Sequence, residues 1–294
     1  MNLTFIRLLQ KIPGFGAVAA RVHPVWYFRL TRWTVTLLGW GLPHTKARAR
    51  VFREVLRNSF DDKELEARTR RYLYFVRLFK DIEIAWINWK QRESDWITVE
   101  GESHLQRALE HGRGAVLMSP HNFGLSKMVA PILAARGYRL HRGGNGGKKL
   151  VYRKSRWGKS AHIDWEYLAY KGDYWHRVQL LKAIQKALAA NDVVHVSPRG
   201  YRQGEPEVAI EFFGLRYFLD TTWFRIFQIC EAPVLPCFAL GSTDGQLRII
   251  IHPALQVTGK TVAKEFAAIQ SDYITQFPEC GRLWKSVYVE RGKW

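Results

Sequence analysis

The sequence lacks the marks of secreted, membrane-spanning and zinc-binding proteins. Its 294 residues include only three cysteines, Cys230, Cys237 and Cys280, without CxxC spacing. We therefore expect reduced, buried thiols in a cytosolic protein, with no metal and no redox cofactor. No run of about 18 uncharged apolar residues occurs, so no membrane-spanning helix is expected. The apolar stretch 15–20 is too short for a signal peptide.

Acidic residues are scarce, and one long segment has none. The chain carries 45 Lys and Arg against 26 Asp and Glu, which gives a formal net charge of +19. Between Glu110 and Asp164 there is no acid, whereas the same interval holds eleven Lys and Arg. Such a surplus favours an anionic partner, which could be a nucleic acid, an anionic membrane surface, an acidic carrier or a phosphorylated substrate. The charge alone does not choose among them.

Residues 1–93 have the residue spacing of helices. Trp26, Trp33 and Trp40 recur with two leucines at steps of three and four residues, which places them on one apolar stripe. Such a stripe packs on the rest of the protein or lies in the interface of a bilayer, and the sequence leaves both readings open. Two further helices are predicted over 45–60 and 61–90.

From residue 94 to 294, apolar runs typical of strands alternate with helical spacing. Strands are predicted over 96–100, 115–119, 139–142, 193–197, 234–240 and 247–251. Helices are predicted over 103–110, 123–135, 178–190 and 222–231. This alternation indicates an α/β domain with a largely parallel central sheet flanked by helices. In such folds functional groups gather where loops leave the carboxyl ends of the strands.

His121 is the first candidate for chemistry. It follows the predicted strand 115–119 and precedes the predicted helix 123–135. A histidine at the end of a strand is placed to act as a general base. A lone histidine is also common as a hydrogen-bonded structural residue, so the position alone does not decide.

Two basic segments are candidates for binding anions. Arg142 precedes a glycine-rich loop, 143–149, that includes Asn145 and whose backbone N–H groups could cradle a phosphate. The alternative is a solvated surface loop, and the pattern of a P-loop is absent. Arg199 and Arg202 follow the predicted strand 193–197 and offer bidentate donors to phosphate or carboxylate groups.

The order of these pieces resembles the bacterial lipid A biosynthesis acyltransferases, the lauroyl and myristoyl transferases. More broadly it is similar to the glycerolipid and lysophospholipid acyltransferases, over about residues 45–294. The matching segments are Leu56–Phe60, Val99-Glu100-Gly101, Gly112-Arg113-Gly114 before His121, Arg142 with Asn145, Arg153 with Arg156, Lys186–Pro198, Phe212-Phe213-Gly214, Asp220-Thr221-Thr222, Ala232–Pro236, and Pro278-Glu279 with Trp284.

The resemblance implies an acyltransferase-like fold and transfer of a fatty acyl chain from an acyl thioester. The donor would be acyl carrier protein or coenzyme A, and the acceptor a lipid or a related hydroxyl or amine. His121 would be the base. The residues implied in holding phosphate or carboxylate groups are Arg142, Asn145, Arg153, Arg199 and Arg202. The protein would be cytoplasmic and peripheral on the inner face of the cell membrane.

Two acids of the family pattern are missing. The family carries HxxxxD or HxxxxE, but Ser126 stands at the acid position, and Arg199 replaces the acid of the later "P-D" element. A serine cannot supply the negative charge that stabilises an imidazolium. If 121–126 were helical, Ser126 would also point away from His121, which disfavours it as a nucleophile. More distant acids could substitute: Asp164, Glu166, Asp173 and Glu211.

Three functions therefore stay open. The protein is an active acyltransferase, a catalytically altered relative that binds lipid or acyl carrier, or a basic nucleic-acid-binding protein. Against the last, the sequence has no RNP1 pattern, no zinc-finger spacing and no single basic helix, so no nucleic acid is expected as a partner.

Overall fold

The fold is built on a seven-stranded sheet. The structure is a computed structural model, and it describes residues 43–88, 97–121, 123–144, 165–169, 174–198, 200–201, 208–219, 221–242, 246–255, 261–281 and 284. The predicted tryptophan stripe (Trp26, Trp33, Trp40) lies outside the described residues. The candidate binding residues Asn145, Arg153, Arg199 and Arg202 also lie outside them.

The central strands run parallel to one another. The strands of this sheet are β1 (Ile97–Glu100), β2 (Ala115–Met118), β3 (Leu140–Gly144), β4 (Trp165–Ala169), β5 (Val193–Val196), β9 (Val234–Gly241) and β10 (Leu247–Ile251). Their order is β1-β10-β9-β2-β5-β3-β4. All neighbouring pairs are parallel except β9 with β10. Every residue of β2 and β5 is buried, as expected for strands covered on both faces.

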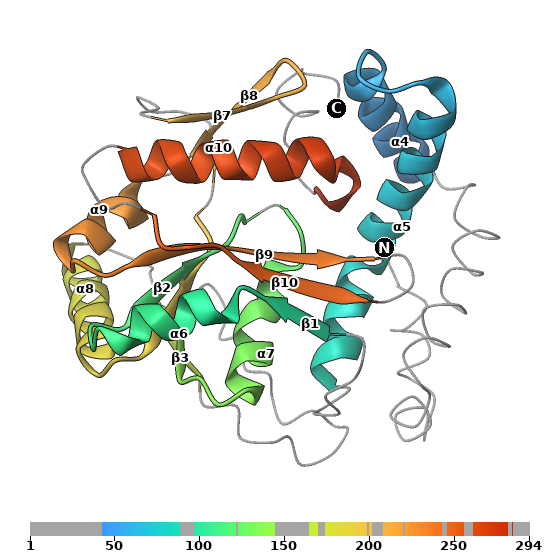
Figure 1. Ribbon diagram of the computed structural model, residues 1–294. Coiled ribbons are helices and arrows are strands. Elements are labelled where there is room, and N and C mark those ends of the chain that lie inside the picture. The colour runs from blue at the N-terminus through green and yellow to red at the C-terminus, as the bar shows by residue number, and fades with distance from the viewer. Residues whose placement is uncertain are drawn as a thin grey trace.

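Helices cover both faces of the sheet (Figure 1). The α-helices are α4 (Pro43–Leu56), α5 (Asp62–Asn88), α6 (Glu102–Glu110), α7 (Val129–Ala135), α8 (Tyr174–Ala189), α9 (Thr222–Ile229) and α10 (Thr261–Gln276), and two 3₁₀ turns are η1 (Ser126–Met128) and η2 (Pro278–Cys280). Helices α6 and α7 bury their apolar residues against one face, with Leu117 and Leu235 of the sheet. The opposite face, with Met118 and Val196, packs against α4, α5, α8, α9 and α10 in one continuous cluster.

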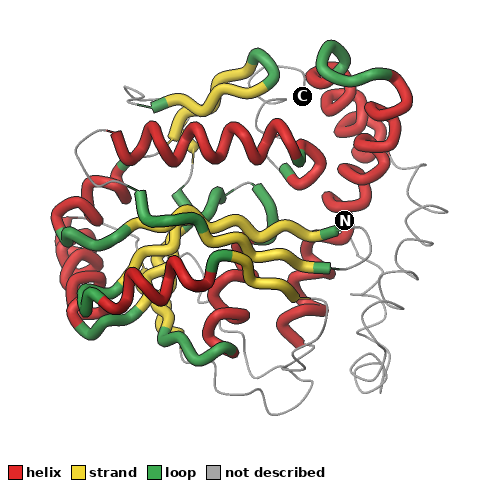
Figure 2. Tube along the Cα trace, viewed as in Figure 1, coloured by secondary structure: helices red, strands yellow, loops and turns green. Residues whose placement is uncertain are grey.

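A small second sheet lies on the outer side of α10 (Figure 2). It consists of β6 (Gly200–Tyr201), β7 (Ala209–Phe212) and β8 (Leu215–Leu219) in the order β6-β8-β7. Phe213 and Gly214, at the turn between β7 and β8, have φ values of 47° and 68°. Two positive φ values in a two-residue hairpin are typical of a type I′ turn, which matches the twist of the flanking strands.

The predicted fold class is confirmed, with corrections to individual elements. The helix predicted over 123–135 is wrong at its start, because 123–125 pairs with other segments and the helix begins as the 3₁₀ turn η1 at Ser126. Strand β4, the small sheet and helix α10 were not predicted from the sequence. Cys237 and Cys280 are buried free thiols as predicted, whereas Cys230 is partly exposed. Among the described helices, none is long and apolar enough to cross a membrane.

Candidate active site at the end of strand β2

His121 lies at the carboxyl end of a central strand. Met118, the last residue of β2, is in register with Val196 of β5 and Pro236 of β9, and both of these strands run parallel to β2. His121 is partly buried in a turn that follows this row of residues. His121 therefore follows the carboxyl end of a strand in the middle of the sheet, which is where functional groups gather in α/β folds.

The chain before His121 is fixed to strand β5. The backbone N–H of Ser119 donates to the carbonyl oxygen of Val196 at 2.9 Å. The hydroxyl of Ser119 lies 3.0 Å from Nε2 of His195, and both side chains are fully buried. Pro120, also buried, then leads directly into His121.

The chain after His121 is fixed to two other segments. Phe123 forms a β-bridge with Gly281, and the N–H of Gly124 donates to the carbonyl of Cys280 at 2.9 Å. The N–H of Leu125 donates to the carbonyl of Ala239 in β9 at 2.7 Å. Gly124 has φ of 61°, and a Cβ there would lie 2.3 Å from the Ala239 oxygen, so only glycine fits. The turn at His121 is thus held on both sides.

The 3₁₀ turn η2 that holds this loop is itself held by helix α5. Glu279 is only 6% exposed and accepts a hydrogen bond from the Arg68 guanidinium at 2.9 Å. Arg71 adds a second ion pair to the same carboxylate at 3.6 Å. Arg68 also donates to the Gln276 carbonyl, and the indole N–H of Trp284 donates to Pro278. Helix α5 therefore supports the His121 turn indirectly, through η2.

A buried polar cluster lies on the α6–α7 face just below His121. It contains Ser119, His195 and Cys237, which come from three adjacent strands, and Arg142 is in register with His195. Burial and the charge of Arg142 hold the pKa of His195 well below its usual value, so the imidazole is neutral at neutral pH. Burial raises the pKa of Cys237 to about 12, so this thiol stays protonated and unreactive.

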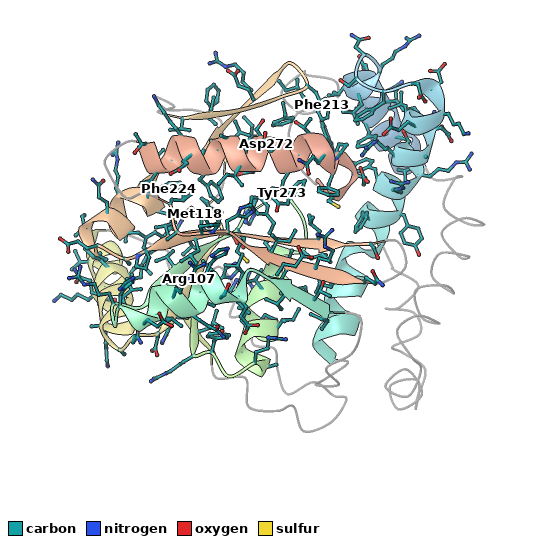
Figure 3. All side chains as sticks on the ribbon, viewed as in Figure 1. Arg107, Met118, Phe213, Phe224, Asp272 and Tyr273 are labelled. Atoms are coloured by element: carbon teal, nitrogen blue, oxygen red, sulfur yellow. The ribbon has the colours of Figure 1, made fainter. Side chains whose placement is uncertain are left out.

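A second polar pair lies on the opposite face, beneath α10. Nε2 of His252 is 3.0 Å from the hydroxyl of Tyr273, and the Tyr273 ring stacks on Phe238 with centroids 3.9 Å apart. Tyr273 and Met118 both lie between α10 and the sheet (Figure 3). Burial lowers the pKa of His252 and raises that of Tyr273, so both side chains are neutral at neutral pH.

Within the described ranges, no group of three or more His, Cys, Asp or Glu side chains is placed to hold a metal ion. What the region offers is a histidine on a restrained turn, with the neutral buried His195 on the next strand and Arg142 one strand further, in register with His195.

Comparison with known families identifies the group to which the protein belongs. The model of the bacterial lipid A biosynthesis acyltransferases matches residues 35–280, well over half of the chain. The chain belongs to this family. Membership supports a lipid acyltransferase activity in general, with an acyl donor and a lipid acceptor as substrates. No curated protein matches the sequence.

Several family segments have clear structural roles in this lipid A acyltransferase relative. Glu100 forms a bidentate ion pair with Arg248 at 2.9 and 3.1 Å, which ties β1 to β10. Gly101 has φ of 72°, and a Cβ there would lie 2.0 Å from the carbonyl oxygen of Ile251. A Cβ at Gly114 would lie 2.7 Å from the Asp192 oxygen. These glycines are required by close backbone contact, not by chemistry.

The position of the missing acid is closed to solvent. Ser126 begins η1 and is 4% exposed among apolar side chains of the α6–α7 face. The expectation that Ser126 points away from His121 along a helix does not apply, because His121 and residues 123–125 are not helical. A buried serine here packs within the core and carries no charge with which to stabilise an imidazolium.

The two distant acids that the structure describes are also poorly placed. Glu166 belongs to β4, which is three strands from β2, or about 14 Å across the sheet. Glu211 is exposed on β7 and pairs with Arg216 at 3.0 Å. Asp164 and Asp173 lie outside the described residues.

Sequence reasoning missed the residues that hold the His121 turn. Ser119, His195 and Cys237 occur singly in apolar strands, and Glu279 was noted only as part of a terminal motif. The available signal was a histidine in the otherwise apolar run Val193–Val196, because a polar residue in a buried strand requires a partner.

Proposed function

We propose that this lipid A acyltransferase family member moves a fatty acyl chain from an acyl thioester to a lipid or related acceptor. The thioester is carried by acyl carrier protein or coenzyme A. The observation that carries the proposal is the restrained turn that presents His121 at the carboxyl end of β2. A base must be held in a fixed geometry to act.

In the proposed reaction His121 removes the proton from a hydroxyl or amine of the acceptor. The freed lone pair attacks the thioester carbonyl carbon, and the tetrahedral intermediate collapses as the carbon–sulfur bond breaks. The leaving thiolate takes the proton back from the imidazolium. Because Ser126 gives no charge to that imidazolium, an amine acceptor, which needs less help from a base, suits the site as well as a hydroxyl.

The basic residues serve binding in this proposal. Arg142, half-buried beside His195, is proposed to hold a phosphate or carboxylate of donor or acceptor together with Asn145, Arg153, Arg199 and Arg202. The acid-free interval 111–163 places eleven Lys and Arg on the two sides of His121 in the sequence, which suits an acidic acyl carrier or coenzyme A phosphates as partner. Docking on the inner face of the cell membrane through the Trp26 stripe belongs to the same proposal.

The test is acyl transfer by the purified protein with acyl-carrier and acyl-CoA donors. His121→Ala is expected to lower kcat/KM by about a hundredfold or more, because general-base catalysis supplies about that factor. His111→Ala, which removes an exposed histidine at the end of α6, is the matched control and is expected to keep wild-type rates. Equal rates for wild type and His121→Ala with every donor would remove His121 from the mechanism.

A second candidate is an accessory protein that binds lipid or acyl carrier without catalysis. It is favoured by the loss of both family acids, at Ser126 and Arg199. Binding of donor by both wild type and His121→Ala with no turnover would support this candidate. Retention on nucleic acid at physiological salt would instead favour a nucleic-acid-binding protein.

A further inference from the structure

We infer that His195 is a positioning residue that acts through Ser119 to set the geometry of His121. The inference rests on the proposed function, because it concerns the same catalytic turn. In acyltransferases with the full HxxxxD or HxxxxE pattern the acid supports the histidine. Here Ser126 is buried in the core and uncharged, and the backbone that leads to His121 contributes to its orientation.

The geometry gives that backbone little freedom. Ser119 is bound by its N–H to Val196 and by its hydroxyl to His195, at 2.9 and 3.0 Å. A residue before proline is restricted to extended conformations, and Pro120 has φ fixed at about −65°. Between the side chain of Ser119 and the start of His121, the only freely rotating backbone angle is therefore ψ of Pro120. A shift of Ser119 is transmitted directly to His121.

The contact joins three strands at the point where the chain leaves the sheet. His195 belongs to β5, Ser119 follows β2, and the hydroxyl of Ser119 also bonds to the thiol of Cys237 in β9. His195 stays neutral because burial and Arg142 disfavour its charged form. The imidazole therefore acts as a neutral hydrogen-bonding group, and its bond to Ser119 persists across the pH range in which a base would work.

Fold stability alone does not account for this histidine. His195 is 0% exposed in an otherwise apolar strand, and its Nδ1 has no hydrogen-bond partner among the described residues. Burying a polar atom without a partner is unfavourable, and a leucine of similar volume would avoid that loss. His195 weakens the core, yet it bonds to Ser119, two positions before the candidate base. We therefore assign it a role in positioning His121.

The experiment compares His195→Leu and Ser119→Ala, which break the bond from its two sides, with His195→Gln, whose amide can replace Nε2. Two measurements are made on the full chain. The first is the set of imidazole NMR signals of His121 in protein with isotope-labelled histidine, assigned by their loss in His121→Ala. The second is kcat and KM for acyl transfer. Thr69→Val, which removes an equally buried hydroxyl bonded to Leu65 in α5, is the matched control.

We expect His195→Leu and Ser119→Ala to shift the His121 signals and to lower kcat by about tenfold with KM little changed, because misplacement affects the reacting geometry. His195→Gln is expected to restore both, and Thr69→Val to leave both unchanged. His121 signals that stay at their wild-type positions in both bond-breaking variants overturn the inference, whether or not the protein turns over. Wild-type protein without turnover counts against the proposed function alone, since the NMR comparison does not depend on activity.

Discussion

At the scale of the residue, Glu279 is the carboxylate on which the support of the His121 turn depends. It is 7% exposed at its side chain and pairs with Arg68 and Arg71, whereas Glu64, 45% exposed, pairs with the same Arg68. Glu279→Gln is expected to lower the free energy of unfolding by about 2 kcal/mol, because it removes the buried charge that pairs with both Arg68 and Arg71.

Glu64→Gln serves as the control for that substitution, and it is expected to change the free energy of unfolding by less than about 0.5 kcal/mol, because solvent screens an exposed pair. Urea unfolding of the two variants makes the comparison. An equal decrease in the free energy of unfolding in the two variants would mean that the burial of Glu279 does not strengthen its ion pairs.

Hydrogen bonds between polar residues that are distant in the sequence could not be predicted. His121 and its place after a strand were predictable, because an apolar run followed by a histidine is a local pattern. The contact between His195 and Ser119 depends on the register of β2 with β5, and no local pattern carries that register. The buried pair of His141 with Asp192, 2.7 Å apart, was missed for the same reason.

At the scale of the element, Trp284 fastens η2 to the rest of the fold. Its ring lies 5.4 Å from Phe52 in α4 and 5.8 Å from Phe212 in β7, and its N–H donates to Pro278. Trp284→Phe is expected to lower the free energy of unfolding by at least about 1 kcal/mol more than Trp223→Phe, because it also removes the buried hydrogen bond from the indole N–H to Pro278.

Trp223 is a suitable control because it is also buried, at 9% exposure, and stacks on Phe227 within α9. Chemical unfolding of both variants gives the stability difference, and acyl transfer by both tests whether η2 matters to the turn. An equal loss of kcat in the two variants would contradict a specific role for η2.

Among the elements, those with strong local patterns were predictable and those shaped by tertiary contacts were not. The wholly apolar strands β2 and β5 were found because parallel strands buried on both faces appear as continuous apolar runs. The predicted start of the helix after His121 was too early, because residues 123–125 pair with β9 and with the η2 segment instead of forming a helix. Strand β4 was not predicted, because it follows a long basic segment of the sequence that lacks strand-like alternation.

At the scale of the whole molecule, the depressed pKa of His195 makes the fold sensitive to mild acid. Its unfolded value is about 6.5, and burial holds the folded value well below this. Below about pH 6.5 the unfolded chain binds a proton that the folded chain does not, so stability falls as the pH is lowered. The free energy of unfolding is expected to fall by up to about 1.4 kcal/mol per pH unit in this window.

Urea midpoints measured on either side of that pH test the expectation. His195→Gln is expected to lose less stability than wild type when the pH is lowered, because its unfolded state no longer gains that proton. His111→Gln, at an exposed position, is expected to keep the wild-type dependence. A pH dependence in His195→Gln as steep as that of wild type would assign the effect to other groups.

The long-range ties of the His121 turn also set an order of assembly during synthesis. Arg68 and Glu279 are 211 positions apart, and Gly281 closes the bridge to Phe123. A nascent chain can pair β2, β5 and β3 long before this part has left the ribosome, but the turn then has anchors only on its amino-terminal side. Chains released early would therefore carry a His121 turn that is held on one side only, and this turn would be the last part of the fold to be fixed.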